Sequence, residues 1–266
     1  MTTLGAACWP KVPPERLRDV ALAAEETGLE ELWLWEDCFW GGAVAQCAAA
    51  LAWTSRLRLA IGVLPAPLRN VAATAMDAAM LHRLFPGRVT LGVGHGVQSW
   101  MRQVGAAAES PMTLLREHLT ATRALLHGEK VTIEGRYTRL DEVALEWPPA
   151  APVPPLLAAA TGPKTLRLSG EVADGTILDV GTGPAELRRA RALIDEGRAA
   201  GGRDDHHWLV VYESVDRLDA AEVAGKVLAL AQAGVDTVVL FPADRHRADP
   251  VDFVHFAARQ VGPLLR

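Results

Sequence analysis

A glycine-rich segment after a short apolar run is the clearest chemical signal in this chain. Residues 89–93 predict a strand, and glycines at positions 92, 94 and 96 surround His95. Backbone without side chains at the end of a strand lets a flat ring or a phosphate approach closely. The dinucleotide pattern Gly-x-Gly-x-x-Gly is not met, because Val97 stands where its third glycine is required. The segment therefore predicts a binding loop for another class of cofactor.

A second candidate binding segment joins a small-residue strand to a helix. It consists of Ala160, Thr161, Gly162 and Pro163. Thr161 can cap the helix, Gly162 lets backbone approach a ligand, and Pro163 suits the first helical turn. Free amides at such a helix start favour an anion. An ordinary capped turn is the alternative interpretation.

Groups that can hold or move a proton follow other predicted strands. Glu36 and Asp37 come directly after residues 32–35, and His95 lies within the glycine loop. We expect His95 to contact cofactor or substrate, with a loop side chain bonded to backbone as the alternative. Arg69 can pair with an anion or a carboxylate, or it is a surface charge at a helix start.

Aromatic side chains dominate the remaining strand ends and predict an apolar pocket. Trp9, Trp40 and Trp100 follow strand ends, and Cys38 lies beside Asp37, so we expect these four to line it. Such a pocket suits a flat heterocycle better than a sugar. At least one of the tryptophans at positions 33 and 35 is expected to pack inside the fold instead.

Apolar runs alternate with helical patterns and predict eight βα units. The expected strands cover residues 4–9, 32–35, 57–63, 89–93, 155–160, 175–179, 208–213 and 237–241. Each is followed by a helical pattern. Eight units favour an α/β fold of the (β/α)8 TIM barrel type over an open doubly wound sheet, which usually has five or six strands. The active site of such a barrel lies at the carboxyl ends of its strands.

One insert interrupts the alternation between the fourth helix and the fifth strand. Residues 131–140 predict a hairpin, and residues 147–155 are rich in proline. Because the βα alternation resumes afterwards, we predict a single domain over residues 1–266.

Composition narrows the class of partner. The net charge is −5 with no run of lysine or arginine, which gives no electrostatic basis for binding nucleic acid or an anionic membrane. A small-molecule partner is expected, and the apolar early helices permit a homodimer. No apolar stretch reaches the roughly 20 residues of a membrane span, and no leader is visible, so we expect a cytoplasmic protein. Three cysteines without paired spacing give no metal motif, and residues 204–207 (Asp-Asp-His-His) predict a solvated turn, so no metal is expected.

Four segments carry a family resemblance when taken together. They are residues 28–37, residues 62–65 with Arg69, residues 85–96, and residues 160–163 with 170–175. In these segments the chain resembles the bacterial luciferase-like superfamily, and within it the coenzyme F420-dependent oxidoreductases related to methylene-tetrahydromethanopterin reductase. The last third of the chain matches only in its rhythm of strands and helices.

The resemblance implies a luciferase-like barrel and a site for a deazaflavin. Gly62 and Val63 would form a bulge behind the deazaflavin ring, often with a non-prolyl cis peptide bond, and Arg69 would belong to the same site. The loop of Gly94, His95 and Gly96 would flank the side chain and phosphate of the cofactor, and the second candidate segment would form the opposite wall. Relatives are often dimers.

The chain departs from the family pattern where a proton is handled. Many relatives have Ser-Asp-His where this chain has Glu36, Asp37 and Cys38, and several have a glutamate in place of Val97. Asp37 is therefore our first candidate for the proton donor, with Glu36, His95 or the substrate itself as alternatives.

The leading functional hypothesis is hydride transfer between coenzyme F420 and a small organic substrate. An FMN-dependent monooxygenase on the same fold is the nearest alternative, and a cofactor-binding barrel without turnover is another. A metal-dependent hydrolase is least favoured, because no His-x-His pair or carboxylate cluster stands at the strand ends.

Overall fold

The computed structural model describes residues 2–179 and 181–265. Within them, eight parallel strands close into a barrel in the order β1-β10-β9-β8-β7-β4-β3-β2. The barrel strands are β1 (Thr3–Ala7), β2 (Glu31–Leu34), β3 (Arg58–Pro65), β4 (Val89–Gly94), β7 (Leu156–Ala159), β8 (Gly175–Leu178), β9 (Trp208–Val215) and β10 (Thr237–Pro242). The predicted (β/α)8 barrel is confirmed.

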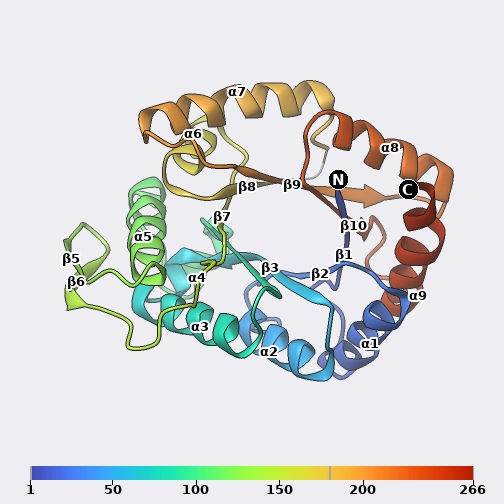
Figure 1. The fold of residues 1–266 in the computed structure, drawn as a ribbon, viewed down its shortest axis with the longest axis horizontal. Helices are drawn as coiled ribbons and strands as arrows, with labels where there is room; N and C mark the ends of the chain where they lie inside the picture. The colour runs from blue at the N-terminus through green and yellow to red at the C-terminus, as the bar shows by residue number, and fades with distance from the viewer. Residues whose placement is uncertain (1, 180, 266) are drawn as a thin grey trace.

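Helices surround the strands as an outer ring (Figure 1). They are α1 (Leu17–Thr27), α2 (Ala43–Trp53), α3 (Val71–Leu84), α4 (Gln98–Gln103), α5 (Pro111–Leu126), α6 (Pro163–Val172), α7 (Pro184–Ala200), α8 (Ala220–Gln232) and α9 (Pro250–His255), the last continued by a π-helical turn, Phe256–Val261. Because the helices cover the outer face and side chains fill the inside, strands such as β2, β8 and β10 are buried along their whole length.

Side-chain caps fix where several of the helices begin. Asn70 accepts a hydrogen bond from the amide of Ala72 at the start of α3, and Asp219 does the same for Ala221 at the start of α8. The α1 helix ends at Gly28, which is left-handed with φ +72°. These local signals set the boundaries of the βα units.

The insert lies outside the barrel beside α5 (Figure 1). Its hairpin consists of β5 (Val131–Glu134) and β6 (Arg139–Val143). Glu117 of α5 accepts three backbone N–H groups from the hairpin turn, those of Arg136, Tyr137 and Thr138, each at 2.8 Å. This carboxylate attaches the hairpin to the barrel's outer ring.

Aromatic side chains fill the barrel interior above an ion pair. Trp33 donates its indole N–H to Glu31 at 2.8 Å, and Arg58 pairs with the same carboxylate at 3.0 Å. Burial raises the pKa of Glu31, and Arg58 opposes that rise. The ring of Trp33 meets the ring of Tyr212 edge to face at 5.9 Å. The packed interior thereby closes the amino-terminal side and leaves the carboxyl side for a site.

Two details of the sequence interpretation are wrong. The short helix α4 after the glycine loop was not expected. In the predicted solvated turn at residues 204–207, Asp204, Asp205 and His206 are exposed as predicted, but His207 is buried. His207 Nε2 lies 2.8 Å from Thr176 Oγ1, which in turn lies 2.6 Å from Ser169 Oγ. This buried polar chain joins α6, β8 and the residue before β9, and such a tertiary contact is not visible in local sequence.

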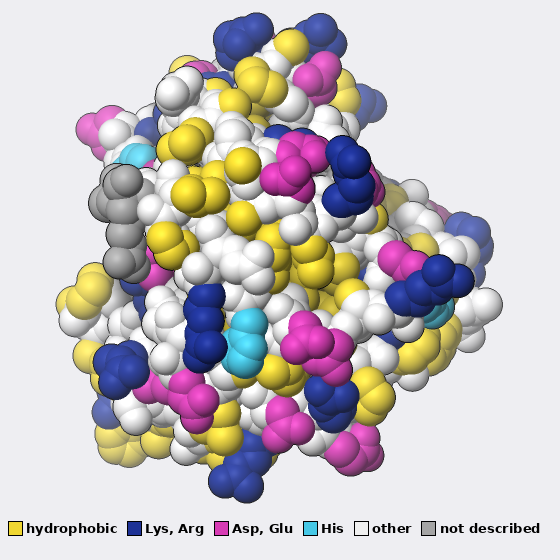
Figure 2. Space-filling view, turned by 90° about the vertical axis from the view of Figure 1, so that its right-hand side faces the viewer, with side chains coloured by type: hydrophobic (Ala, Val, Ile, Leu, Met, Phe, Trp, Pro, Cys, Tyr) yellow, Lys and Arg dark blue, Asp and Glu magenta, His cyan; other side chains and the backbone are white. Residues whose placement is uncertain are grey.

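Charges of both signs are mixed on the side of the molecule that carries α8, α9 and α1. On the face shown in Figure 2, acidic and basic side chains are interspersed. Among the described residues, none of the helices combines the length and apolar composition that crossing a membrane requires.

The buried histidines predict a loss of stability in mild acid. Burial lowers the pKa of His207 to about 3 and that of His118 to about 4. Nearby arginines add to the shift of His207, and Arg69 adds to that of His118. Histidines of the unfolded chain titrate near about 6.5, so the unfolded state gains protons first as pH falls. Stability is therefore full above about pH 6.5 and declines below it, by about 2 kcal/mol per histidine at about pH 5.

Urea denaturation at about pH 7 and about pH 5 measures this loss. The variants His118→Gln and His207→Gln should each reduce the pH dependence, whereas His246→Gln, on the exposed loop after β10, should leave it unchanged. Equal stability of the wild-type protein at both pH values would contradict the assignment.

Candidate functional site

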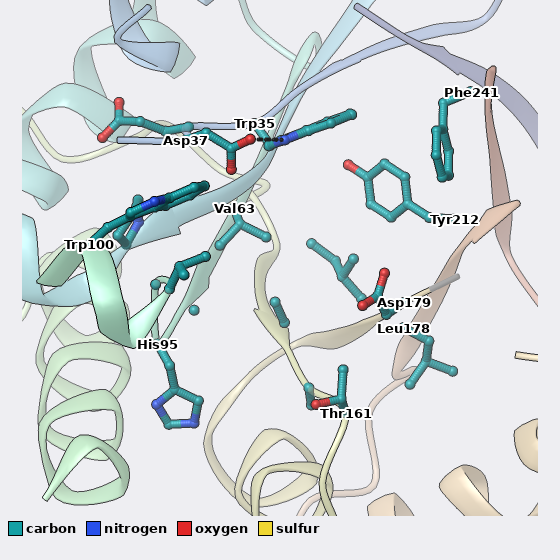
Figure 3. Close-up of a pocket in the computed structure, with 18 of the residues that line it drawn as sticks. Trp35, Asp37, Val63, His95, Trp100, Thr161, Leu178, Asp179, Tyr212 and Phe241 are labelled. Atoms are coloured by element: carbon teal, nitrogen blue, oxygen red, sulfur yellow. Dashed lines mark hydrogen bonds between the residues drawn. The ribbon is translucent and has the colours of Figure 1, made fainter. Parts of the chain in front are cut away.

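A cavity of about 470 Å³ opens at the carboxyl ends of the barrel strands. Figure 3 shows its walls, which combine an aromatic and aliphatic floor with a few polar groups. The lining residues are Trp35, Glu36, Asp37, Val63, Pro65, Gly94, His95, Gly96, Val97, Trp100, Ala159, Ala160, Thr161, Ile177, Leu178, Asp179, Tyr212, Phe241 and Arg245. The two predicted binding segments therefore reach one common cavity.

The glycine loop gives this cavity a wall of exposed backbone. A Cβ atom at Gly94 would lie 2.9 Å from Val63 Cγ1 and 3.2 Å from the Cβ of Ala159. Gly96 has φ +67°, a conformation that favours glycine, and a Cβ there would lie 3.0 Å from Pro65. Only glycine fits both positions without displacing the neighbouring wall.

The third barrel strand contains the predicted bulge. The pairing of β3 with β4 shifts register between Ile61 and Leu64, which turns Val63 toward the cavity while Gly62 lies behind it. The bulge does not contain the non-prolyl cis peptide bond that the resemblance suggested, since Ala151–Pro152 is the one cis bond among the described residues.

The start of α6 forms the opposite wall. Ala160 and Thr161 line the cavity, while Gly162 and Pro163 lie just beyond it and begin the helix. Gly162 is the capping residue and no side chain caps it, so the expected cap by Thr161 is wrong. The amides of the first turn are left to an anion or to solvent.

Glu36 and Arg69 bind each other. Glu36 Oε2 accepts a hydrogen bond from Arg69 Nη2 at 2.7 Å and another from the amide of Ala43, the first residue of α2, at 2.9 Å. Arg69 does not reach the cavity wall, and its second neighbour is Asp77 at 3.7 Å. Of the two partners predicted for Arg69, an anion or a carboxylate, the structure shows the carboxylate of Glu36. This ion pair fixes the start of α2.

Asp37 is the half-buried acid of the cavity. Its Oδ2 accepts a hydrogen bond from the indole N–H of Trp35 at 3.2 Å (Figure 3). Burial raises the pKa of Asp37 above the ordinary value, and Trp35, Arg245 and Lys11 oppose the rise. The carboxyl group is thus closer to its titration range at neutral pH than a solvated aspartate.

His95 lines the cavity, but its ring turns toward α6, away from Asp37 (Figure 3). Its Nε2 lies 3.3 Å from Thr165 Oγ1. Burial lowers the pKa of His95, with the Pro111 carbonyl opposing, so the ring is neutral at pH 7. In this orientation the His95 ring stabilises the glycine loop and is not directed at a reacting group.

The predicted aromatic pocket is only partly right. Trp100 lines the cavity from α4, whereas Trp40 is exposed and Cys38 is buried outside the cavity. Trp9 is 3% exposed, packs on Phe253 and donates its indole N–H to the Arg245 carbonyl at 3.1 Å. Trp9 therefore supports a lining residue and is not one itself.

Several lining residues were not among the candidates chosen from sequence. They are Trp35, Pro65, Val97, Ala159, Ile177, Leu178, Asp179, Tyr212, Phe241 and Arg245. Most belong to the last strands or directly follow them. The signal that could have found them is position, because residues near the carboxyl end of each barrel strand that alternate inward must meet at the same mouth.

Comparisons with known proteins give a consistent result. A family model described as luciferase-like monooxygenase matches residues 2–225. The chain is 31% identical over 254 residues to a 5,10-methylenetetrahydromethanopterin reductase of Methanolobus tindarius, which covers 93% of this chain and 76% of that protein. It is also 33% identical over 184 residues to an F420-dependent glucose-6-phosphate dehydrogenase of Nakamurella multipartita. That match covers 65% of this chain and 54% of the relative.

A solved structure shares the whole fold. The coenzyme F420-dependent tetrahydromethanopterin reductase from Methanopyrus kandleri superimposes with a TM-score of 0.83 over 100% of this chain and 99% of that one. The sequence identity is 19%, so this likeness concerns the fold alone.

The contacts of Glu36 predict a supporting role for this residue. Glu36→Gln keeps an acceptor for Ala43 but leaves the half-buried Arg69 without its closest anion. We expect the free energy of unfolding to fall by about 1 to 3 kcal/mol in urea denaturation. Glu222→Gln, on the exposed surface of α8, is the control and should change it by less than about 0.5 kcal/mol. Unchanged stability of Glu36→Gln would remove the supporting role.

Proposed function

The chain belongs to the luciferase-like monooxygenase family, and from that membership we propose an oxidoreductase that transfers a hydride between coenzyme F420 and a small organic substrate. The name of the Nakamurella relative supports the choice of F420 within this family. A cofactor that carries out the redox chemistry leaves little for charged side chains to do, which agrees with the few charged groups in the cavity wall.

One observation carries the proposal. The glycine loop after β4 and the segment before α6, which the family resemblance assigns to two sides of one cofactor, line the same cavity. Between them the floor is apolar, and Val63, Ile177 and Phe241 contribute to it. A flat heterocycle with an anionic side chain suits this combination of apolar floor and open backbone.

The residues present fit such a cofactor. Gly94 and Gly96 leave space that a Cβ would fill, Val63 would lie behind the ring, and the uncapped start of α6 offers amides to an anion. When bound, the deazaflavin supplies the carbon that carries the hydride. The protein supplies the orientation of the ring and the exclusion of water.

Asp37 is the proposed group that exchanges a proton with the substrate. It faces the cavity, and its raised pKa brings the carboxyl group nearer to the working pH. The Trp35 hydrogen bond fixes the direction of the carboxylate. Glu36 is less suited, because its carboxylate is already bound to Arg69 and Ala43.

An FMN-dependent monooxygenase is the second candidate function. The description of the matching family names a monooxygenase. A deazaflavin has carbon in place of N5 and reacts poorly with oxygen, so the two candidates differ in a property that can be measured.

Fluorescence titration with F420 and with FMN tests the cofactor. We expect F420 to bind at least about tenfold more tightly than FMN. Gly94→Ala should weaken F420 binding, because its methyl group collides with Val63, whereas Gly225→Ala on α8, with open space around it, should bind as the wild type does. Tighter FMN binding with oxygen consumption would favour the monooxygenase, and F420 binding without hydride exchange would favour a barrel without turnover.

Asp37→Asn tests the proton assignment. The amide keeps the shape and cannot exchange the proton, so turnover of F420 with the best alcohol or aldehyde from a panel should fall by about 100-fold or more. F420 affinity should stay near that of the wild type. Asp19→Asn, exposed on α1, is the control. Wild-type turnover in Asp37→Asn would end the assignment.

We also propose that the protein forms a homodimer through α3. Met76, Met80 and Leu84 are spaced four residues apart on this helix and are 61%, 49% and 62% exposed. A row of exposed apolar side chains along one helix is typical of a protein contact.

Light scattering after gel filtration measures the dimer. We expect Met80→Glu to shift the mass from dimer toward monomer, because it places a charge in the apolar row. Leu218→Glu changes an exposed leucine outside α3 and should leave the dimer intact. A monomeric wild-type protein at about 100 μM would contradict the proposal.

A further inference from the structure

Two basic side chains stand near Asp37 at the mouth of the cavity. Arg245, in the loop between β10 and α9, lines the cavity, and Lys11 lies in the loop after β1. Both are exposed, and the charge of each opposes the rise in the pKa of Asp37. Within residues 2–179 and 181–265, no acid forms an ion pair within 4.0 Å of either cation. The mouth therefore offers positive charge that the fold itself does not use.

The backbone at Arg245 is fixed by a buried side chain. Trp9, which is 3% exposed, donates its indole N–H to the Arg245 carbonyl at 3.1 Å. The end of the same loop is attached by the ion pair of Arg16 with Asp249, at 3.0 Å. These two attachments hold the loop of Arg245 in place beside the cavity.

The guanidinium of Arg245 lies over an aromatic ring of the cavity floor. Its Cζ atom is 5.6 Å from the centre of the Phe241 ring. Phe241 meets Trp35 at 6.4 Å, and Trp35 donates to Asp37 at 3.2 Å. In Figure 3 Asp37, Trp35 and Phe241 lie on the side of the cavity away from Thr161, which belongs to the wall proposed for the cofactor. The positive charge thus stands on the same side as the proposed proton donor.

Two contacts hold Lys11 next to this loop. Its Nζ lies 5.9 Å from the centre of the Trp40 ring and 3.1 Å from Nε2 of His246. An ammonium group can only donate, so the imidazole nitrogen accepts this hydrogen bond. Lys11 therefore joins the loop after β2, which contains Asp37, to the loop of Arg245. A lysine that is already held loses less conformational freedom on meeting an anion than a freely rotating one.

The charges at the mouth fit a carboxylate. A guanidinium offers two parallel N–H groups to the oxygens of a carboxylate or of a phosphate. Asp37 and Asp179 also belong to the cavity wall, and they oppose a doubly charged phosphate more strongly than a singly charged carboxylate. An organic acid with one negative charge is therefore the better match.

We propose that Arg245 binds a carboxylate group of the substrate and that Lys11 adds attraction at the mouth, so that small oxo acids and hydroxy acids are the substrate class. This inference rests on the proposed hydride transfer. An oxo acid becomes a hydroxy acid by gaining one hydride at the carbonyl carbon, from the reduced cofactor, and one proton at the oxygen, from Asp37. The carboxylate is unchanged, and its contact with Arg245 fixes the substrate relative to Asp37.

The first test compares two probes of nearly the same shape on the F420-loaded protein. Calorimetry should show that the wild type binds cyclohexanecarboxylate about 10-fold more tightly than Arg245→Gln does, because a charge-assisted hydrogen bond is lost. For the neutral cyclohexanecarboxamide the two proteins should differ by less than about twofold. Equal affinity of both proteins for the carboxylate, or no binding of it, overturns the proposal.

Arg247→Gln is the matched control, because it removes the same charge from the same loop. The Arg247 side chain is 90% exposed, lies 3.7 Å from Asp244 and is not part of the cavity wall. This variant should bind cyclohexanecarboxylate as the wild type does. A loss as large as that of Arg245→Gln would show an effect of net charge alone and would overturn the site. Acetate should displace the probe at a lower concentration than inorganic phosphate does, and the reverse order would overturn the choice of a carboxylate.

Titration with F420 separates the substrate from the cofactor as the source of the anion. The affinity of Arg245→Gln for F420 should stay within about twofold of the wild type. A loss of about 10-fold or more would assign Arg245 to the anionic side chain of the cofactor, which overturns the substrate class while F420 binding stands. Failure of the wild type to bind F420 removes the proposed function and this inference with it.

Lys11→Gln gives an independent reading of the second cation. Cyclohexanecarboxylate should bind this variant about 2- to 3-fold more weakly at low salt, and the difference should shrink at about 0.5 M salt, because exposed charges are screened. Unchanged affinity at low salt would overturn the part assigned to Lys11.

Discussion

The packed interior of the barrel is the constraint on which the site depends. Eight parallel strands can close only if inward side chains fill the space between them, and here that filling is aromatic. Toward the amino-terminal side, the Trp33 indole donates a hydrogen bond to Glu31, which pairs with Arg58. Tyr212 packs against the other side of this layer, on the Trp33 ring. The layer of Trp35, Tyr212 and Phe241 is thus both the upper end of the core and the floor of the cavity. Site and core share side chains, so the shape of the floor is as rigid as the fold.

The glycines near the site belong to one packing arrangement. A Cβ at Gly92 would lie 2.1 Å from the carbonyl oxygen of Gly62, and one at Gly62 would lie 2.0 Å from the Tyr212 hydroxyl. The bulge in β3 and the strand that leads into the glycine loop therefore approach each other more closely than side chains allow. The loop that first suggests a phosphate-binding site is at the same time the means by which β3 and β4 pack around a bulge.

Sequence reasoning succeeds where the cause is local. The strands are nearly continuous apolar runs because they are buried on both faces, and caps such as Asn70 mark helix starts, so the βα order could be read directly. It fails for side chains whose direction depends on closure of the barrel. Trp9 and Trp100 both follow strand ends, yet one is buried against Phe253 and the other lines the cavity. Tyr212 carries no local motif at all, since its place follows from the register of β9 with β10 and from the space at Gly62.

The same geometry bears on positions 38 and 97, where the family resemblance predicts a histidine and a glutamate that this chain does not have. Val97 adds apolar surface at the mouth, and Cys38 is a buried thiol whose pKa is raised by burial, so neither exchanges a proton near neutral pH. Glu36 is bound to Arg69, which leaves Asp37 as the acid whose direction is fixed and whose surroundings are apolar. The proposed hydride transfer would need only one such proton group, because the cofactor would carry the electrons. Exposed backbone on one side of the cavity would then bind the cofactor, and an oriented acid on the other side would exchange the proton.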